Sequence, residues 1–166
     1  MDIIGFLKKG RIKWPFKPGI PTYKSFPIGP YSLDMEIAAL SGLREFSKME
    51  YREVIRQFKG ERIYHGPDVD FLGCDWKMRV NVVSGKIYKI TAYIETKDRT
   101  LANRAVMDTF LYCKNKMGEP NKQRNEMFIW ETIDGDVALQ TTEAPERFGI
   151  NLFLTSHAVR DFFRLR

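Results

Sequence analysis

The chain has no long hydrophobic run and no recognisable export segment. Nowhere do apolar residues continue for the roughly 20 positions that a membrane-spanning helix needs. Its first residues, MDIIGFLKKGRIKW, have neither the apolar stretch nor the small-residue cleavage site of a secretory signal. We therefore expect no transmembrane segment and a cytoplasmic protein.

Cysteine and histidine are scarce. The two cysteines, Cys74 and Cys113, are not arranged as CxxC and have apolar neighbours, which predicts buried free thiols in a reducing compartment. The two histidines, His65 and His157, leave few places for an acid–base pair. The motifs G-x-G-x-x-G, G-x-x-x-x-G-K-[ST], H-E-x-x-H and G-x-S-x-G are all absent. We expect no cofactor, and binding rather than catalysis.

Hydrophobic residues are plentiful enough for one core. The chain has 166 residues, of which 43% are hydrophobic and 13% aromatic. A chain of this length buries most of the surface that its unfolded form exposes, so it needs neither a metal nor a disulfide to fold. This composition predicts one globular domain.

Positive charge and proline are concentrated at one end. The formal net charge is +6, and residues 1–33 hold six basic residues against one acidic residue, which gives +5 and leaves +1 elsewhere. The same segment holds five of the eight prolines, which exclude regular helix and central strand. It also holds six aromatic residues, which is unlike a disordered tail. We predict an extended basic arm over 1–33, lying on its own domain or on a neighbour, and a single α+β domain over 34–166.

Helical periodicity occurs twice in the α+β region. Ser47 and Glu50 form a capping box, and apolar residues then recur at spacings of three and four, so we expect a helix over 48–58. A second helix is expected over 101–117, where Gly118 ends it. Ser156 is expected to cap a short terminal helix.

Alternating polar and apolar residues predict antiparallel strands. Turns are expected at 66–68, at Ser84-Gly85 and at Asp134-Gly135. The fold prediction is an antiparallel sheet of about six strands with two main helices on one face. The order fits a duplicated α–β–β–β unit and fits equally well the ordinary periodicity of an α+β domain. The strands are expected at 62–65, 69–74, 76–83, 86–95, 127–132, 137–142 and 148–154.

The segment HGPDVDFLGCD has the densest group of candidate metal-ligating or catalytic side chains, namely His65, Asp68 and Asp70. Carboxylates two positions apart on a strand point to the same face, so Asp68 and Asp70 could converge on a hard cation. One of them could also act as a general base. The spacing does not fit a calcium loop, and aspartate after Gly-Pro is equally typical of a turn.

The arm interleaves cations with aromatic rings in KKGRIKWPFK. Cations bind phosphate and rings stack on exposed bases, as in nucleic-acid binding. The same composition suits an anionic membrane surface, and the rings can equally fill grooves on the protein's own domain. The candidate binding residues are Lys8, Lys9, Arg11, Lys13, Trp14 and Phe16.

Together these patterns favour a non-enzymatic protein-binding or assembly module. Its expected partner is another protein or a second copy of the chain, met by the arm or by an open sheet face. The alternatives are nucleic-acid binding through the arm, and an enzyme or metal site around His65, Asp68 and Asp70. A membrane surface is the least favoured partner.

Overall fold

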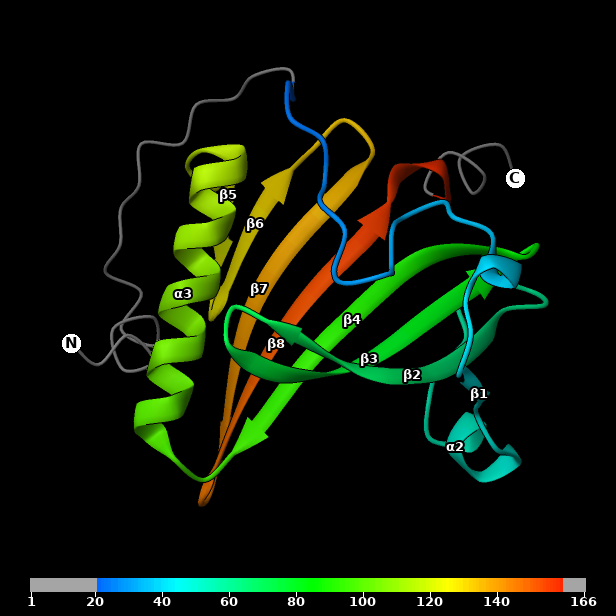
Figure 1. The fold of residues 1–166 in the computed structure, drawn as a ribbon, viewed down its shortest axis with the longest axis horizontal. Coiled ribbons are helices and arrows are strands. Elements are labelled where there is room, and N and C mark those ends of the chain that lie inside the picture. Colours follow the sequence, from blue (N-terminus) through cyan, green and yellow to red (C-terminus); the bar gives the residue numbers. More distant parts are fainter. Residues whose placement is uncertain (1–20, 160–166) are drawn as a thin grey trace.

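The described chain folds around one antiparallel sheet of eight strands (Figure 1). The computed structural model describes residues 21–159. Across the sheet the strands lie in the order β1-β2-β3-β4-β8-β7-β6-β5. The helices are the 3-10 helix η1 (Ile37–Ala39), α2 (Lys48–Arg52) and α3 (Arg99–Met117). The strands are β1 (Arg44–Glu45), β2 (Arg62–Phe71), β3 (Cys74–Val83), β4 (Lys86–Thr96), β5 (Lys122–Arg124), β6 (Met127–Glu131), β7 (Gly135–Ala144) and β8 (Arg147–Ser156).

Two hairpins predicted from the sequence are confirmed. Ser84 and Gly85 join β3 to β4, and their φ angles of 52° and 77° suit a tight two-residue turn. In the second hairpin β6 and β7 pair antiparallel. Because β4 pairs with β8, the strands before α3 and those after it merge into one sheet.

One face of the sheet, which we call the covered face, holds the main core. Trp76, Met78 and Val80 of β3 point to it and are no more than 1% exposed. α3 lies on this face and contacts β4, β7 and β8. The buried side of α3 holds mostly small or medium side chains, which lets the helix lie close to the sheet. These are Ala102, Ala105, Val106, Thr109, Cys113 and Met117.

Both cysteines are buried free thiols, as predicted. Burial raises the pKa of Cys113 to about 12. The thiolate is therefore almost absent at neutral pH, and we assign Cys113 to the core rather than to chemistry.

Residues 21–35 cover more of the same face beside α3. Phe26, Ile28 and Tyr31 are no more than 6% exposed and belong to the same core cluster as α3. The Phe26 ring meets the ring of Tyr112 in α3 edge to face, with 5.0 Å between centroids. In Figure 1 this segment (blue) passes across the strands toward η1. Part of the sequence that predicts an arm thus packs on its own domain.

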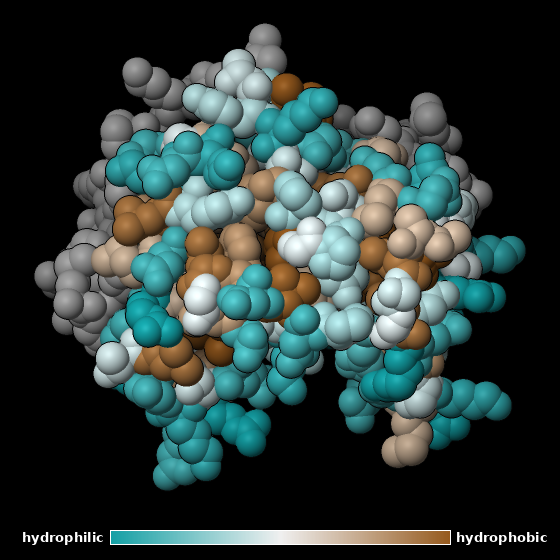
Figure 2. All heavy atoms as spheres, viewed as in Figure 1, coloured by the Kyte–Doolittle hydropathy of each residue, from teal (hydrophilic) through white to brown (hydrophobic). Residues whose placement is uncertain are grey.

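Close packing at Gly66 locks this segment to the sheet. A Cβ atom on Gly66 would lie 2.0 Å from the Tyr31 hydroxyl oxygen, so only glycine fits beneath this ring. Seen from the same side, hydrophobic side chains reach the surface only in small groups among hydrophilic ones (Figure 2). The covered face is therefore largely sealed by α3 and the N-terminal segment.

Polar contacts fasten both ends of the N-terminal segment. The backbone N–H and hydroxyl of Ser25 donate to Asp134, at 2.7 Å and 2.5 Å. Burial opposes ionisation of Asp134, but the hydrogen bonds from Ser25 and Thr132 hold its pKa below the usual value. At the other end the Ser156 hydroxyl donates to Asp34 at 2.7 Å.

The helix predicted over 48–58 is much shorter than expected. α2 ends at Arg52, although the capping box of Ser47 and Glu50 is formed as predicted. The prediction failed because the carboxylate of Glu61 accepts hydrogen bonds from the backbone N–H groups of Gln57 and Phe58. These bonds hold 53–61 as an irregular segment, and Ile55, expected in the core, is 94% exposed.

The sheet also differs in detail from its prediction. It has eight strands instead of about six, because the short β1 and β5 lack any alternating pattern. Residues 66–68 form an irregularity inside β2 rather than a turn, and Leu72-Gly73 makes the hairpin to β3. The predicted terminal helix begins at 157–159, where the Ser156 hydroxyl accepts the Ala158 N–H at 3.2 Å, and the residues after Val159 lie outside the described part of the chain.

The two α-helices lie on opposite faces, so their predicted placement on one face is wrong. Ile63, whose backbone N–H donates to the Tyr51 hydroxyl of α2, is paired in register with Asn81. Asn81 points away from the face on which Met78 and Val80 meet α3, because side chains alternate along a strand.

No helix among residues 21–159 is long and apolar enough to cross a membrane.

Candidate functional site

The face of the sheet opposite α3, which we call the open face, is the best candidate for a functional surface. α2 packs on it beside β1 and β2, and residues 53–61 reach the end of β3 and the start of β4. Over β4 and β8 it presents two half-buried aromatic rings, Tyr93 and Phe153. The strand register places further polar and apolar side chains on this face, namely Lys77, Arg79, Asn81, Lys89, Thr91, Asp136, Ala138, Gln140, Asn151 and Thr155.

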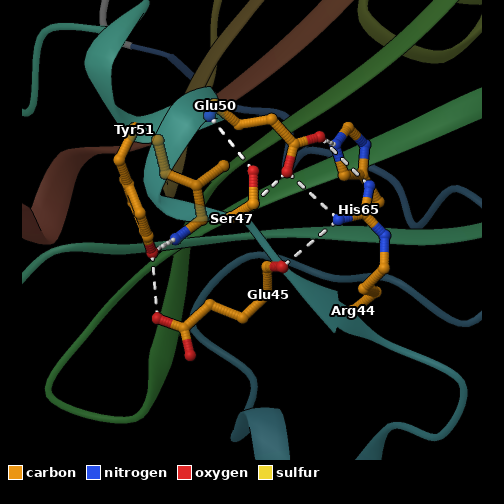
Figure 3. A network of polar contacts seen from close by, with 7 residues as sticks. Arg44, Glu45, Ser47, Glu50, Tyr51 and His65 are labelled. Atoms are coloured by element: carbon orange, nitrogen blue, oxygen red, sulfur yellow. Dashed lines mark hydrogen bonds and ion pairs between the residues drawn. The ribbon is translucent and has the colours of Figure 1, made fainter.

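A polar network fixes α2 at the edge of the open face. The carboxylate of Glu50 accepts both Arg44 guanidinium bonds at 3.1 Å and contacts Nε2 of His65 at 2.8 Å. The Tyr51 hydroxyl donates to Glu45 at 3.1 Å and accepts the Ile63 N–H at 2.9 Å. Figure 3 shows these side chains converging from α2, β1 and β2.

Electrostatics and ring stacking reinforce this edge. The Arg44 guanidinium, the Ser47 backbone and His65 together hold the pKa of Glu50 far below its usual value. The ring of Phe46 stacks on His65 with centroids 4.6 Å apart. The Arg44–Glu50 pair is exposed to solvent and adds little stability, so its main effect is to fix the position of α2.

Glu61 is the buried anchor of the segment that follows. Its side chain is 2% exposed in a sheet-facing position. One carboxylate oxygen accepts from Gln57 and Phe58, and the other from the Tyr88 hydroxyl and from Asn81 Nδ2 at 2.9 Å. Burial, and then Glu61 itself, raise the pKa of Tyr88 well above its usual value. Four donors thus satisfy this carboxylate without a cation.

A pocket of about 370 Å³ lies between the 53–61 segment and the open face. Its floor consists of Arg79 and Asn81 of β3 and Lys89 of β4, of which Asn81 and Lys89 lie opposite each other. Its wall is made by the segment, by β2 and by the start of β4, with Glu53, Val54, Ile55, Gln57, Glu61, Ile63 and Tyr88.

Two polar atoms of the floor, Nε of Arg79 and Oδ1 of Asn81, are buried without a hydrogen-bond partner among the described residues. The same is true of Oγ1 of Thr91, which lies opposite Arg79 but does not line the pocket. Burial and the nearby Arg79 lower the pKa of Lys89, and its ammonium lies 5.0 Å from the centre of the Phe153 ring. Buried polar groups are normally satisfied, so a cluster of unsatisfied ones marks a place to look for a ligand.

The residues predicted to form a metal site are not arranged around a common point that could hold an ion. His65 contacts Glu50 and Phe46. Asp68 lies in the irregularity of β2, while Asp70 is paired with Asp75, and all three aspartates are exposed. Within residues 21–159 no group of three or more His, Cys, Asp or Glu side chains is arranged to hold a metal ion.

The predicted binding residues of the arm lie outside the described part of the chain. They are Lys8, Lys9, Arg11, Lys13, Trp14 and Phe16. The sequence did carry a signal for the floor of the pocket, since alternation in β3 puts Lys77, Arg79 and Asn81 on a wet face. It carried none for Glu61, whose four donors come from separate segments.

Comparisons of the chain with protein-family models, with curated proteins and with solved structures found no match.

Proposed function

We propose that this protein is a non-enzymatic binding module that docks another protein on the open face of its sheet. The observation that carries the proposal is the contrast between the two faces. The covered face is sealed by α3 and by Phe26, Ile28 and Tyr31, whereas the open face presents Tyr93 and Phe153 half-buried over β4 and β8. Aromatic rings beside cations are typical of the centre of protein interfaces.

The neighbouring groups support a protein partner of mixed polarity. Ala138 and Phe153 are direct cross-strand partners on this face, and Gln140 and Asn151 form the next pair. A surface with apolar centres and paired amides can bury rings and still exchange hydrogen bonds with a partner. A second copy of the chain is one such partner. We infer a cytoplasmic location, which two buried free thiols support.

The strand order also supports the proposal that the domain is a duplicated α–β–β–β unit. β2-β3-β4 and β6-β7-β8 are both antiparallel meanders, and they meet at β4 and β8. The two tryptophans do not occupy equivalent places, because Trp76 is in the middle strand of the first meander and Trp130 is in the outer strand of the second. The duplication therefore rests on topology alone.

Changing Tyr93 to aspartate tests the proposed docking face. The full chain carrying Tyr93→Asp should recover at least tenfold less partner in co-purification from cells of the source organism, because a carboxylate would be buried unpaired in the interface. Sedimentation velocity of the purified chain shows whether that partner is a second copy.

Leu111→Asp is the matched control, since Leu111 is 45% exposed on α3, away from the open face. It should leave the recovered partner unchanged. Equal recovery by the two variants would contradict the proposal, and recovery abolished by nuclease would favour nucleic-acid binding instead.

A further inference from the structure

The pocket beside β3 and β4 has the composition of a site for one negative charge. Arg79 and Lys89 supply two cations on its floor, and Glu61 supplies one buried carboxylate in its wall. Glu53 lies on the exposed rim, where water screens it. No ion pair within residues 21–159 engages Arg79 or Lys89. The enclosed groups therefore leave one positive charge uncompensated.

The unsatisfied donor of Arg79 indicates the geometry of that anion. Nε of Arg79 is buried and free to donate. A guanidinium that offers Nε together with a terminal nitrogen matches the two oxygens of a carboxylate. Lys89 reaches the same floor from the neighbouring strand, because it lies opposite Asn81 and two residues from Thr91.

The wall indicates what carries the carboxylate. Val54, Ile55 and Ile63 give the pocket an apolar side, while Gln57 and Tyr88 lie near its polar end. A short aliphatic chain ending in one carboxylate would place methylenes against the wall and oxygens on the floor. A phosphate dianion fits less well, because Glu61 lies in the same pocket.

We propose that this pocket receives the side-chain carboxylate of a glutamate from the docked protein. The proposal rests on the proposed function, because the pocket opens on the face to which we assign the partner. Arg79 binds the carboxylate in a bidentate manner, and Lys89 adds the second charge. The exposed Ile55 then covers the methylenes of the glutamate side chain.

The direct test is an NMR titration of the full chain with three small probes. N-acetylglutamate α-methylamide should shift the Nε–H signal of Arg79 and the amide signals of Asn81 and Lys89, and the shift should saturate. The corresponding glutamine compound should bind at least tenfold more weakly, and inorganic phosphate no more tightly than the glutamate compound. Equal binding of the glutamine compound, or tighter binding of phosphate, would overturn the carboxylate assignment.

Two variants separate this inference from the proposed function. Arg79→Lys keeps the charge but loses the guanidinium, so it should weaken both glutamate-probe binding and partner recovery at least tenfold. Lys116→Met removes an exposed cation from α3, on the other side of the sheet and outside the pocket, and should change neither. Partner recovery that falls with Tyr93→Asp and persists with Arg79→Lys would overturn the inference and leave the proposed function standing. Probe binding with no partner recovered by the wild-type chain would overturn both.

Discussion

Replacing Tyr31 by alanine is expected to lower the free energy of unfolding by about 3–5 kcal/mol, as for other buried aromatic residues. Tyr31 is 1% exposed and belongs to the core cluster, although it lies in the proline-rich segment. Its ring also fills the space above Gly66. Urea unfolding followed by tryptophan fluorescence or circular dichroism measures the change.

Tyr23→Ala is the matched control, because Tyr23 is 52% exposed and its backbone oxygen, which alanine keeps, accepts from Ile133 in the loop between β6 and β7. It should change the unfolding free energy by less than about 0.5 kcal/mol. Deleting residues 1–33 removes Phe26 and Ile28 as well, at about 1.5–3 kcal/mol for each buried large side chain. The sum is comparable to the whole stability of a domain, so the deleted chain should not fold. Equal stability of the two tyrosine variants would contradict the packing described for this segment.

Replacing Glu61 by alanine is the second change with a large expected effect, about 3 kcal/mol or more. The substitution leaves the Tyr88 hydroxyl, Asn81 Nδ2 and two backbone N–H groups without their acceptor. Each buried polar group left unpaired costs about 1–3 kcal/mol. Hydrogen exchange should also accelerate at the amides of Gln57 and Phe58, because Glu61 is what holds them.

The control for this change is Glu53→Ala, which removes an exposed carboxylate from the same segment and should cost little. The pH dependence of stability gives a second test. The pKa of Tyr88 is higher in the folded chain than in the unfolded chain, so the folded state holds the phenolic proton more tightly. The contribution of Tyr88 to the free energy of unfolding is therefore fully present below about pH 10 and declines as the pH rises above it. Glu61→Ala should weaken that decline, and a variant as stable as the wild type would refute the role given to Glu61.

The elements that the sequence predicted well are those with strong local signals. Alternation in β3 and β4, together with the glycine after Ser84, specified a hairpin that the structure contains. The Asp98-capped helix α3 begins within two residues of its predicted start and ends where expected. In both cases a repeating pattern over many residues determines the element, and distant contacts only confirm it.

The predictions that failed depend on contacts between segments far apart in the sequence. The apolar residues after α2 have helical spacing, yet Glu61 binds the backbone at 57 and 58 and ends the helix early. Burial of Phe26, Ile28 and Tyr31 could not be read from a segment rich in proline, because burial depends on the surface across which the segment lies. Of the residues in the metal prediction, His65 contacts Glu50, fifteen residues earlier in the chain, while Asp68 and Asp70 are exposed on β2.

Sequence patterns predicted only part of the candidate site. Alternation placed Arg79 and Asn81 on one face, but their lack of partners became visible only with all the neighbouring side chains in place. The surroundings of Lys89 are formed by β3, by β8 and by the pocket wall that contains Glu61. A site built across strands depends on which residues are paired between the strands. An alternating pattern predicts the face on which a residue lies but does not predict its partner on the neighbouring strand.

Photo-cross-linking from position 93 tests the central claim most directly, namely that the open face of the sheet is where a partner binds. A benzophenone amino acid is placed at Tyr93 in one full-length chain and at Leu111 in another, and both chains are irradiated in cells. We predict a discrete protein adduct from position 93 and none from position 111, because position 111 lies on the helix that seals the other face. An adduct from position 111 with none from position 93 would contradict the account.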